Sequence, residues 1–116
     1  MSRQIATNIC TALPGSTCDD LLGPGHDSWK VGGKIFASIG AASSTVSVKT
    51  DSVETATMLI DAGAARRAAY FHRSWVAVPL DAAPEDLRHR LVTSYTLIRA
   101  KLPKSVRDEL PPYPEG

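Results

Sequence analysis

The chain has 116 residues, which is enough for one domain with its own core and no stabilising disulfide or metal. Its composition, 43% hydrophobic and 22% charged, is ordinary for a globular protein. No apolar run reaches the roughly 18 residues of a membrane span. The N-terminus lacks the basic and apolar stretches of a secretion signal. We therefore expect a cytoplasmic protein without membrane association.

The net charge of +1 conceals an uneven distribution along the chain. Residues 62–107 carry nine basic and three acidic side chains, giving +6, whereas the rest carries four basic and nine acidic ones, giving −5. A chain polarised in this way can attract an anionic partner with one face. The alternative is that the arginines solvate helix faces and pair with carboxylates one helical turn away.

The first half of the chain predicts one helix followed by strands. Apolar residues at helical spacing predict a helix over 3–13, and residues 15–25 are rich in turn-forming and acidic residues, which favours a loop. Gly32-Gly33 is typical of a hairpin turn between two strands. We expect these strands at 28–31 and 34–39, and a third at 45–49.

Strict alternation in the strand over 34–39 makes a further prediction about its faces. It places Ile35, Ala37 and Ile39 on one face and Phe36 on the opposite face, with Lys34 and Ser38. If the second face is open, Phe36 is available to a partner.

The second half of the chain has clearer boundaries. Asp51 can cap a helix that Gly63 ends. Residues 64–71 suit either a helix or a strand, and residues 75–80 alternate as a strand. The remaining elements are a helix that begins at Pro84 and ends before Pro103, a short helix over 104–110 and a loose tail over 111–116.

This order of elements predicts a single domain over residues 1–110. Strands that follow one another through hairpins, with helices segregated to one side, form an α+β two-layer sandwich. We expect the arrangement α-β(3)-α-β(2)-α, with an antiparallel sheet and the helices packed on one of its faces. The other face is then open to solvent or to a partner.

Metal and catalytic motifs are absent from the sequence. Cys10 and Cys18 are too few for a structural zinc site, and the three histidines lack ligand spacing. A disulfide between the cysteines is conceivable, but Cys10 lies on an apolar helical stripe and is better explained as a small buried residue. We expect no cofactor, no metal and no catalytic residues.

The segment His72-Arg73-Ser74-Trp75 is the strongest candidate for a binding surface. Strand alternation turns Trp75 away from Val76, so the indole and the Arg73 guanidinium can share the open face of the sheet. Aromatic rings beside cations suit nucleic acids, because bases stack and phosphates need counter-charge. The alternative is that Trp75 packs beneath a loop or against the first helix. Trp29 has the same two interpretations, with burial favoured.

Several of these segments together resemble the MmcQ/YjbR family of small bacterial proteins. The resemblance covers about residues 5–107 and runs in the order of the family's motifs. The matching segments are 24–37, 46–51, Tyr70, 73–76, 94–95 and 101–104.

The resemblance implies a fold and a function. The fold is an α-β-β-β-α-β-β-α two-layer sandwich, similar to type III secretion chaperones and frataxin-like proteins. The function is DNA binding, for which the family offers no catalytic residues. Lys34, Lys49, Arg73 and Trp75 lie at motif positions, whereas Arg66 and Arg67 lie where the family has no fixed basic pair.

We therefore predict DNA binding of low sequence specificity, because no recognition helix is evident. The alternatives are a chaperone-like module that binds another protein through the open face, and, third, a small-molecule site or enzyme where His72, Tyr70 or Tyr95 converge. The predicted nucleic-acid contacts are Lys34, Lys49, Arg66, Arg67, Arg73, Trp75, Lys101 and Lys104.

Overall fold

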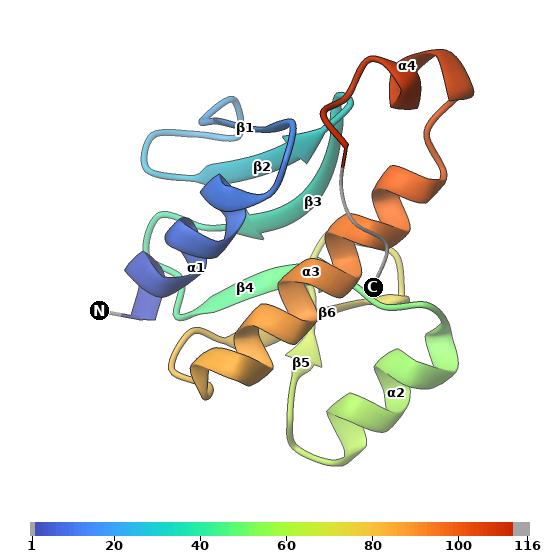
Figure 1. The fold of residues 1–116 in the computed structure, drawn as a ribbon. Coiled ribbons are helices and arrows are strands. Elements are labelled where there is room, and N and C mark those ends of the chain that lie inside the picture. The colour runs from blue at the N-terminus through green and yellow to red at the C-terminus, as the bar shows by residue number, and fades with distance from the viewer. Residues whose placement is uncertain (1, 113–116) are drawn as a thin grey trace.

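Six antiparallel strands form one sheet, and helices cover one face of it in the computed structural model, which describes residues 2–112 (Figure 1). The strand order is β1-β2-β3-β4-β6-β5. The helices are α1 (Ser2–Ala12), α2 (Val53–Asp61), α3 (Pro84–Ala100) and α4 (Lys104–Asp108). The strands are β1 (Ser16–Asp19), β2 (Asp27–Val31), β3 (Lys34–Ile39), β4 (Thr45–Lys49), β5 (Arg66–Arg67) and β6 (Trp75–Pro79). The predicted α+β sandwich is confirmed.

One strand of the sheet was not predicted. Residues 16–19, expected to be a loop, form β1 and pair with β2 at the edge of the sheet. No side chain of β1 is buried, so the segment has no apolar alternation to reveal it. Backbone pairing holds it, together with an ion pair of 2.9 Å between Lys30 and Asp19.

The N-terminal cap of α2 is also one residue later than predicted. Ser52, not Asp51, has the extended cap conformation, and its hydroxyl accepts a hydrogen bond of 3.0 Å from the Thr55 amide. Gly63 follows the helix with φ of +77°, as its stop signal predicts.

Phe36 lies on the helix-covered face, so the predicted alternation of β3 is wrong at Ile35 and Phe36, although Ala37 and Ile39 share one face as predicted. Trp29 pairs with Ala37, but the next residue, Lys30, pairs with Ile35. Phe36 is therefore the extra residue of a β-bulge, which reverses the alternation on either side of it. Its side chain is fully buried in the main core, while Ile35 packs on the opposite face of the sheet.

The main core lies between the helices and the sheet. Cys10 and Trp29 are buried there, as predicted. Both cysteines are free thiols, and burial raises the pKa of Cys10 to about 12. The largest fully buried hydrophobic side chains of this core are Val31, Phe36, Ile39, Val46, Val48, Val76, Leu87, Leu91 and Tyr95.

A smaller cluster covers part of the opposite face. It consists of Ala68, Trp75 and Ala77, with Ile35 and Phe71 packed against them. The rest of that face has no helix over it (Figure 1).

No helix within residues 2–112 is long and apolar enough to cross a membrane. Of the predicted tail, Pro111 and Pro112 are exposed, and the Pro111 carbonyl accepts a hydrogen bond from Arg99. The remainder of the tail, residues 113–116, lies outside the described residues.

Candidate nucleic-acid interface

The topology brings five of the predicted cations to one end of the sheet. β3 begins at Lys34, the antiparallel β4 ends at Lys49, and β6 begins just after Arg73. Lys101 caps the C-terminus of α3 and is close enough to Lys49 to act on its charge. Lys104 begins α4. We call this set, Lys34, Lys49, Arg73, Lys101 and Lys104, the basic end.

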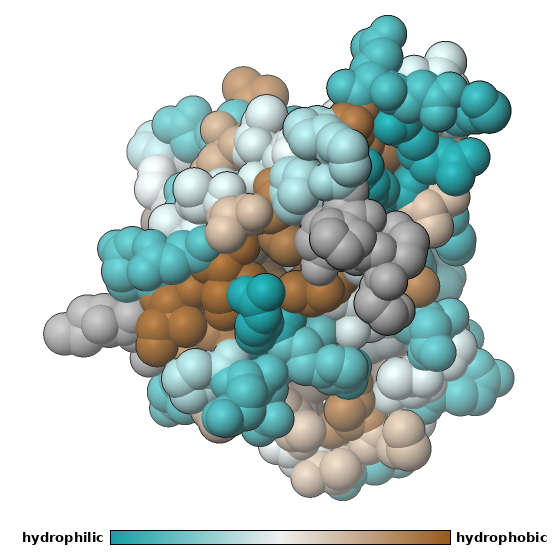
Figure 2. Space-filling view, in the orientation of Figure 1, coloured by the Kyte–Doolittle hydropathy of each residue, from teal (hydrophilic) through white to brown (hydrophobic). Residues whose placement is uncertain are grey.

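The hairpin turn joins this end to the C-terminal helices. Gly32 has φ of +58° and lies against Leu102, so closely that a Cβ at this position would come within 2.5 Å of a Leu102 methyl carbon. Only glycine fits both the turn and this contact. The packing holds the hairpin that carries Lys34 beside the segment that carries Lys101 and Lys104. Hydrophilic side chains gather over α4 in Figure 2.

The backbone of Lys49 is fixed by a side chain from the helix layer. β3 and β4 pair at only two positions, and at the next one the Ser94 hydroxyl of α3 enters between the strands. It accepts from the Lys49 amide at 2.9 Å and donates to the Phe36 carbonyl at 2.6 Å. Ser94 thus replaces a missing rung of the ladder and positions Lys49.

The Lys49 ammonium is held by a second serine. Its Nζ donates to Ser74 Oγ at 2.9 Å, and the same hydroxyl lies 2.9 Å from His72 Nδ1. The Ser74 amide also donates to His72 Nδ1, at 3.1 Å, so this ring nitrogen is an acceptor. Burial lowers the pKa of Lys49, and the positive charge of Lys101 lowers it further.

The basic end has few carboxylate partners. Within residues 2–112 there are three ion pairs, and among the seven predicted cations only Lys104 takes part in one, with Asp108. Of the alternative explanation for the arginines, the pairing with carboxylates one helical turn away is not found among the described residues, whereas Arg88 is exposed on α3. Lys34, Arg73 and Lys101 are exposed.

Arg66 and Arg67 lie apart from the basic end. They form β5, the edge strand beyond β6, and both are exposed. The Arg67 guanidinium donates to the Phe71 carbonyl at 3.4 Å. The seven predicted cations therefore fall into two groups, the basic end and the pair Arg66 and Arg67.

Trp75 belongs to neither group, because it packs beneath a loop. Only 8% of its surface is exposed, and the Phe71 ring stacks on it with centroids 4.3 Å apart. Of the two placements considered, the structure shows the buried one, so the expectation of an accessible indole is wrong. Phe36 is buried as well. The aromatic surface expected for bases or for a protein partner is therefore absent from these two positions.

Serines are the functional residues that the sequence did not reveal as such. In the sequence, Ser74 stands out only as a neighbour of Trp75, and Ser94 only as part of a family segment. Their role depends on hydrogen bonds between segments far apart in the chain. The signal in the sequence is that both serines lie in family segments, 73–76 and 94–95, and the structure shows that these segments converge on Lys49 with 46–51 and 101–104.

The fold and this convergence define an α+β sandwich with a cationic site at one end of its sheet. The family model of YjbR matches residues 11–97, so the chain belongs to the YjbR family, as the resemblance predicted. No curated protein matches the sequence.

A solved structure supports the same assignment. The crystal structure of Deinococcus radiodurans protein DR2400, with the family-model domain DUF419, is similar with a TM-score of 0.77 and 25% sequence identity. The match covers 88% of this chain and 82% of that one.

Proposed function

We propose that the protein binds nucleic acid in the cytoplasm, with low sequence specificity, through phosphate contacts at the basic end. The observation that carries this proposal is that Lys49 lies within electrostatic reach of Lys101, and that neither ammonium forms an ion pair with a carboxylate within residues 2–112. Two adjacent cations repel each other, and a bound phosphate relieves that repulsion.

The geometry of Lys49 supports an anionic ligand. Within residues 2–112 its ammonium donates to Ser74 alone, which leaves two of its three N–H groups for a ligand. Because Ser74 and Ser94 already fix this side chain and its backbone, less conformational entropy is lost on binding.

Low specificity follows from what the basic end lacks. Phosphate contacts position a protein on nucleic acid, whereas sequence is read by side chains that reach base edges. Trp75, the predicted stacking residue, is covered by Phe71 and is not proposed as a contact.

Fluorescence anisotropy with labelled duplex and single-stranded DNA, at several salt concentrations, tests the proposal. If four or five cations contact phosphates, log K falls against log salt with a slope of roughly −4 for duplex DNA. Absence of binding at low salt, or binding indifferent to salt, contradicts the proposal.

Matched variants locate the surface. Lys49→Gln and Lys101→Gln should each weaken binding on all sequences and reduce the salt slope by about 1. Arg88→Gln is the control, because Arg88 is cationic and exposed like Lys101 but lies in the first half of α3, away from the basic end. Equal losses in all three variants contradict a defined interface.

A further inference from the structure

A groove crosses the helix-free face of the sheet, away from the basic end. Its volume is about 340 Å³, within the range of small-ligand sites. Ser38, Ser47 and Ala77 are cross-strand neighbours on β3, β4 and β6, and all three line it. These small side chains leave the space above the sheet unfilled, and two of them offer hydroxyl groups.

One rim of the groove is cationic and aromatic. Arg66 pairs with Ala77 in the sheet register and, with Arg67, lines the groove. Neither guanidinium forms an ion pair within residues 2–112, and no carboxylate lines the groove. The rim therefore offers two cations that an anionic ligand would neutralise.

Tyr70 completes this rim in an unusual conformation. It is the one described non-glycine residue with positive φ, at +71°, and its side chain is fully exposed. A bulky residue in this region costs roughly 1–3 kcal/mol of strain, which tends to be retained at functional positions. The hydrogen bond from Arg67 to the Phe71 carbonyl ties the same loop to β5.

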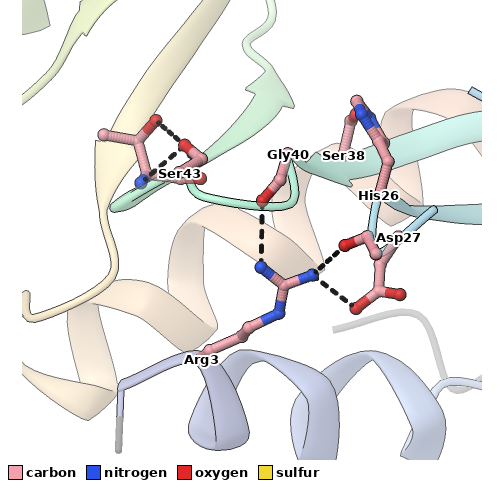
Figure 3. Close-up of polar contacts among 8 residues, drawn as sticks. Arg3, His26, Asp27, Ser38, Gly40 and Ser43 are labelled. Atoms are coloured by element: carbon pink, nitrogen blue, oxygen red, sulfur yellow. Dashed lines mark hydrogen bonds and ion pairs between the residues drawn. The ribbon is translucent and has the colours of Figure 1, made fainter. Parts of the chain in front are cut away.

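The opposite rim is rigid. It is lined by His26, Gly40 and Ser43, and the His26 Nε2 lies 2.7 Å from the floor hydroxyl of Ser38. Arg3 of α1 clamps this rim, since its guanidinium donates to the Gly40 carbonyl at 2.9 Å and to the Asp27 carboxylate at 3.0 Å (Figure 3).

Two further hydrogen bonds hold the segments next to this rim. Arg3 also donates to the Gly25 carbonyl at 2.8 Å, and the Ser43 hydroxyl accepts from the Thr45 amide at 3.1 Å. A rim held in this way is already organised before a ligand arrives.

We infer that this groove binds a nucleoside monophosphate. Arg66 and Arg67 form ion pairs with its phosphate, and the Tyr70 ring packs against the base. The hydroxyls of Ser38 and Ser47 form hydrogen bonds with its ribose. A free nucleoside monophosphate and one unpaired nucleotide of a strand have the same chemistry here, because both make every contact named. This inference does not depend on DNA binding at the basic end.

Isothermal titration calorimetry with AMP, adenosine and inorganic phosphate tests the inference on the full chain. AMP should bind more tightly than either fragment. Arg66→Gln should weaken AMP about tenfold and leave adenosine unchanged, because it removes one charge-assisted contact. Tyr70→Gly should weaken both AMP and adenosine, and it places no strain on the backbone because glycine accepts positive φ.

Two controls make the result decisive. Arg88→Gln, outside the groove, should leave AMP binding unchanged. The inference is overturned if AMP does not bind at millimolar concentration, or if Arg66→Gln and Tyr70→Gly bind it like wild type. It is also overturned if Lys49→Gln abolishes AMP binding, because the phosphate then sits at the basic end. Tighter binding of a short single strand than of AMP, with the same loss in Arg66→Gln and Tyr70→Gly, supports the site and identifies the source as nucleic acid.

Discussion

The two faces of the sheet differ in how completely large side chains cover them. The helix-covered face is filled by large side chains such as Phe36, Leu91 and Tyr95, all fully buried. The helix-free face has one large indole, Trp75, covered by the Phe71 ring, and beyond it a floor of Ser38 and Ser47. The first face stabilises the fold. The helix-free face is covered only where the loop that carries Phe71 lies over Trp75, so the rest of this face is available to a ligand.

Truncating one aromatic residue on each face measures this difference directly. Phe36→Ala should lower the free energy of unfolding by about 4 kcal/mol, because a cavity opens inside close-packed side chains. Trp75→Ala should cost roughly 2–3 kcal/mol, because the loop that carries Phe71 can settle into part of the space. Urea denaturation of both variants provides the values. A cost for Trp75→Ala equal to or above that of Phe36→Ala would show that both faces are equally packed.

A substitution at Ser94 tests the hydrogen bonds by which α3 bridges β3 and β4. Ser94→Ala should cost about 2 kcal/mol, since the Lys49 amide and the Phe36 carbonyl both lose their partner in a buried place. Hydrogen exchange should become faster at the Lys49 amide. Ser105→Ala, on the exposed surface of α4, is the matched control and should change neither measurement. An unchanged exchange rate at Lys49 would contradict the bridging role.

The smallest expected effect concerns the charge at the basic end. Burial and then Lys101 lower the pKa of Lys49. Lys101→Met should therefore raise this pKa but not restore its usual value, because burial remains. An NMR titration that follows the Lys49 side chain provides the measurement, with Lys34→Met as control. A downward or absent shift in Lys101→Met would contradict the proximity of the two ammonium groups.

The lowered pKa of Lys49 also predicts how folding stability and phosphate binding change with pH. Between the lowered pKa of folded Lys49 and its usual value of 10.5, the folded chain binds fewer protons than the unfolded chain. Stability therefore rises with pH through that window. Phosphate binding should fall over the same window, because the ammonium is lost.

Much of the fold could be predicted because local signals agree with the tertiary structure. Gly32-Gly33, Pro84 and Gly63 mark a turn and two helix boundaries, and the structure has them in these places. β1 could not be predicted, since its short polar segment is defined by pairing with β2.

The site was less accessible to prediction. A bulge in β3 moved Phe36 to the other face, and a bulge has no reliable mark in a single strand's sequence. The burial of Trp75 depends on the loop conformation that brings Phe71 over it. Lys49 and Lys101 were chosen individually, but their proximity follows only from the way α3 crosses the sheet. DNA binding itself stays a prediction.

The bridge made by Ser94 has one more consequence. In most sheets, neighbouring strands hydrogen-bond to each other directly. Here the Lys49 amide of β4 and the Phe36 carbonyl of β3 both bond to the Ser94 side chain of α3 instead. Beyond the two paired positions of these strands, the hydrogen bonds that link Phe36 of β3 to Lys49 of β4 pass through this one hydroxyl group. A shift of α3 along its axis would therefore act directly on the backbone of Lys49, whose half-buried ammonium belongs to the basic end.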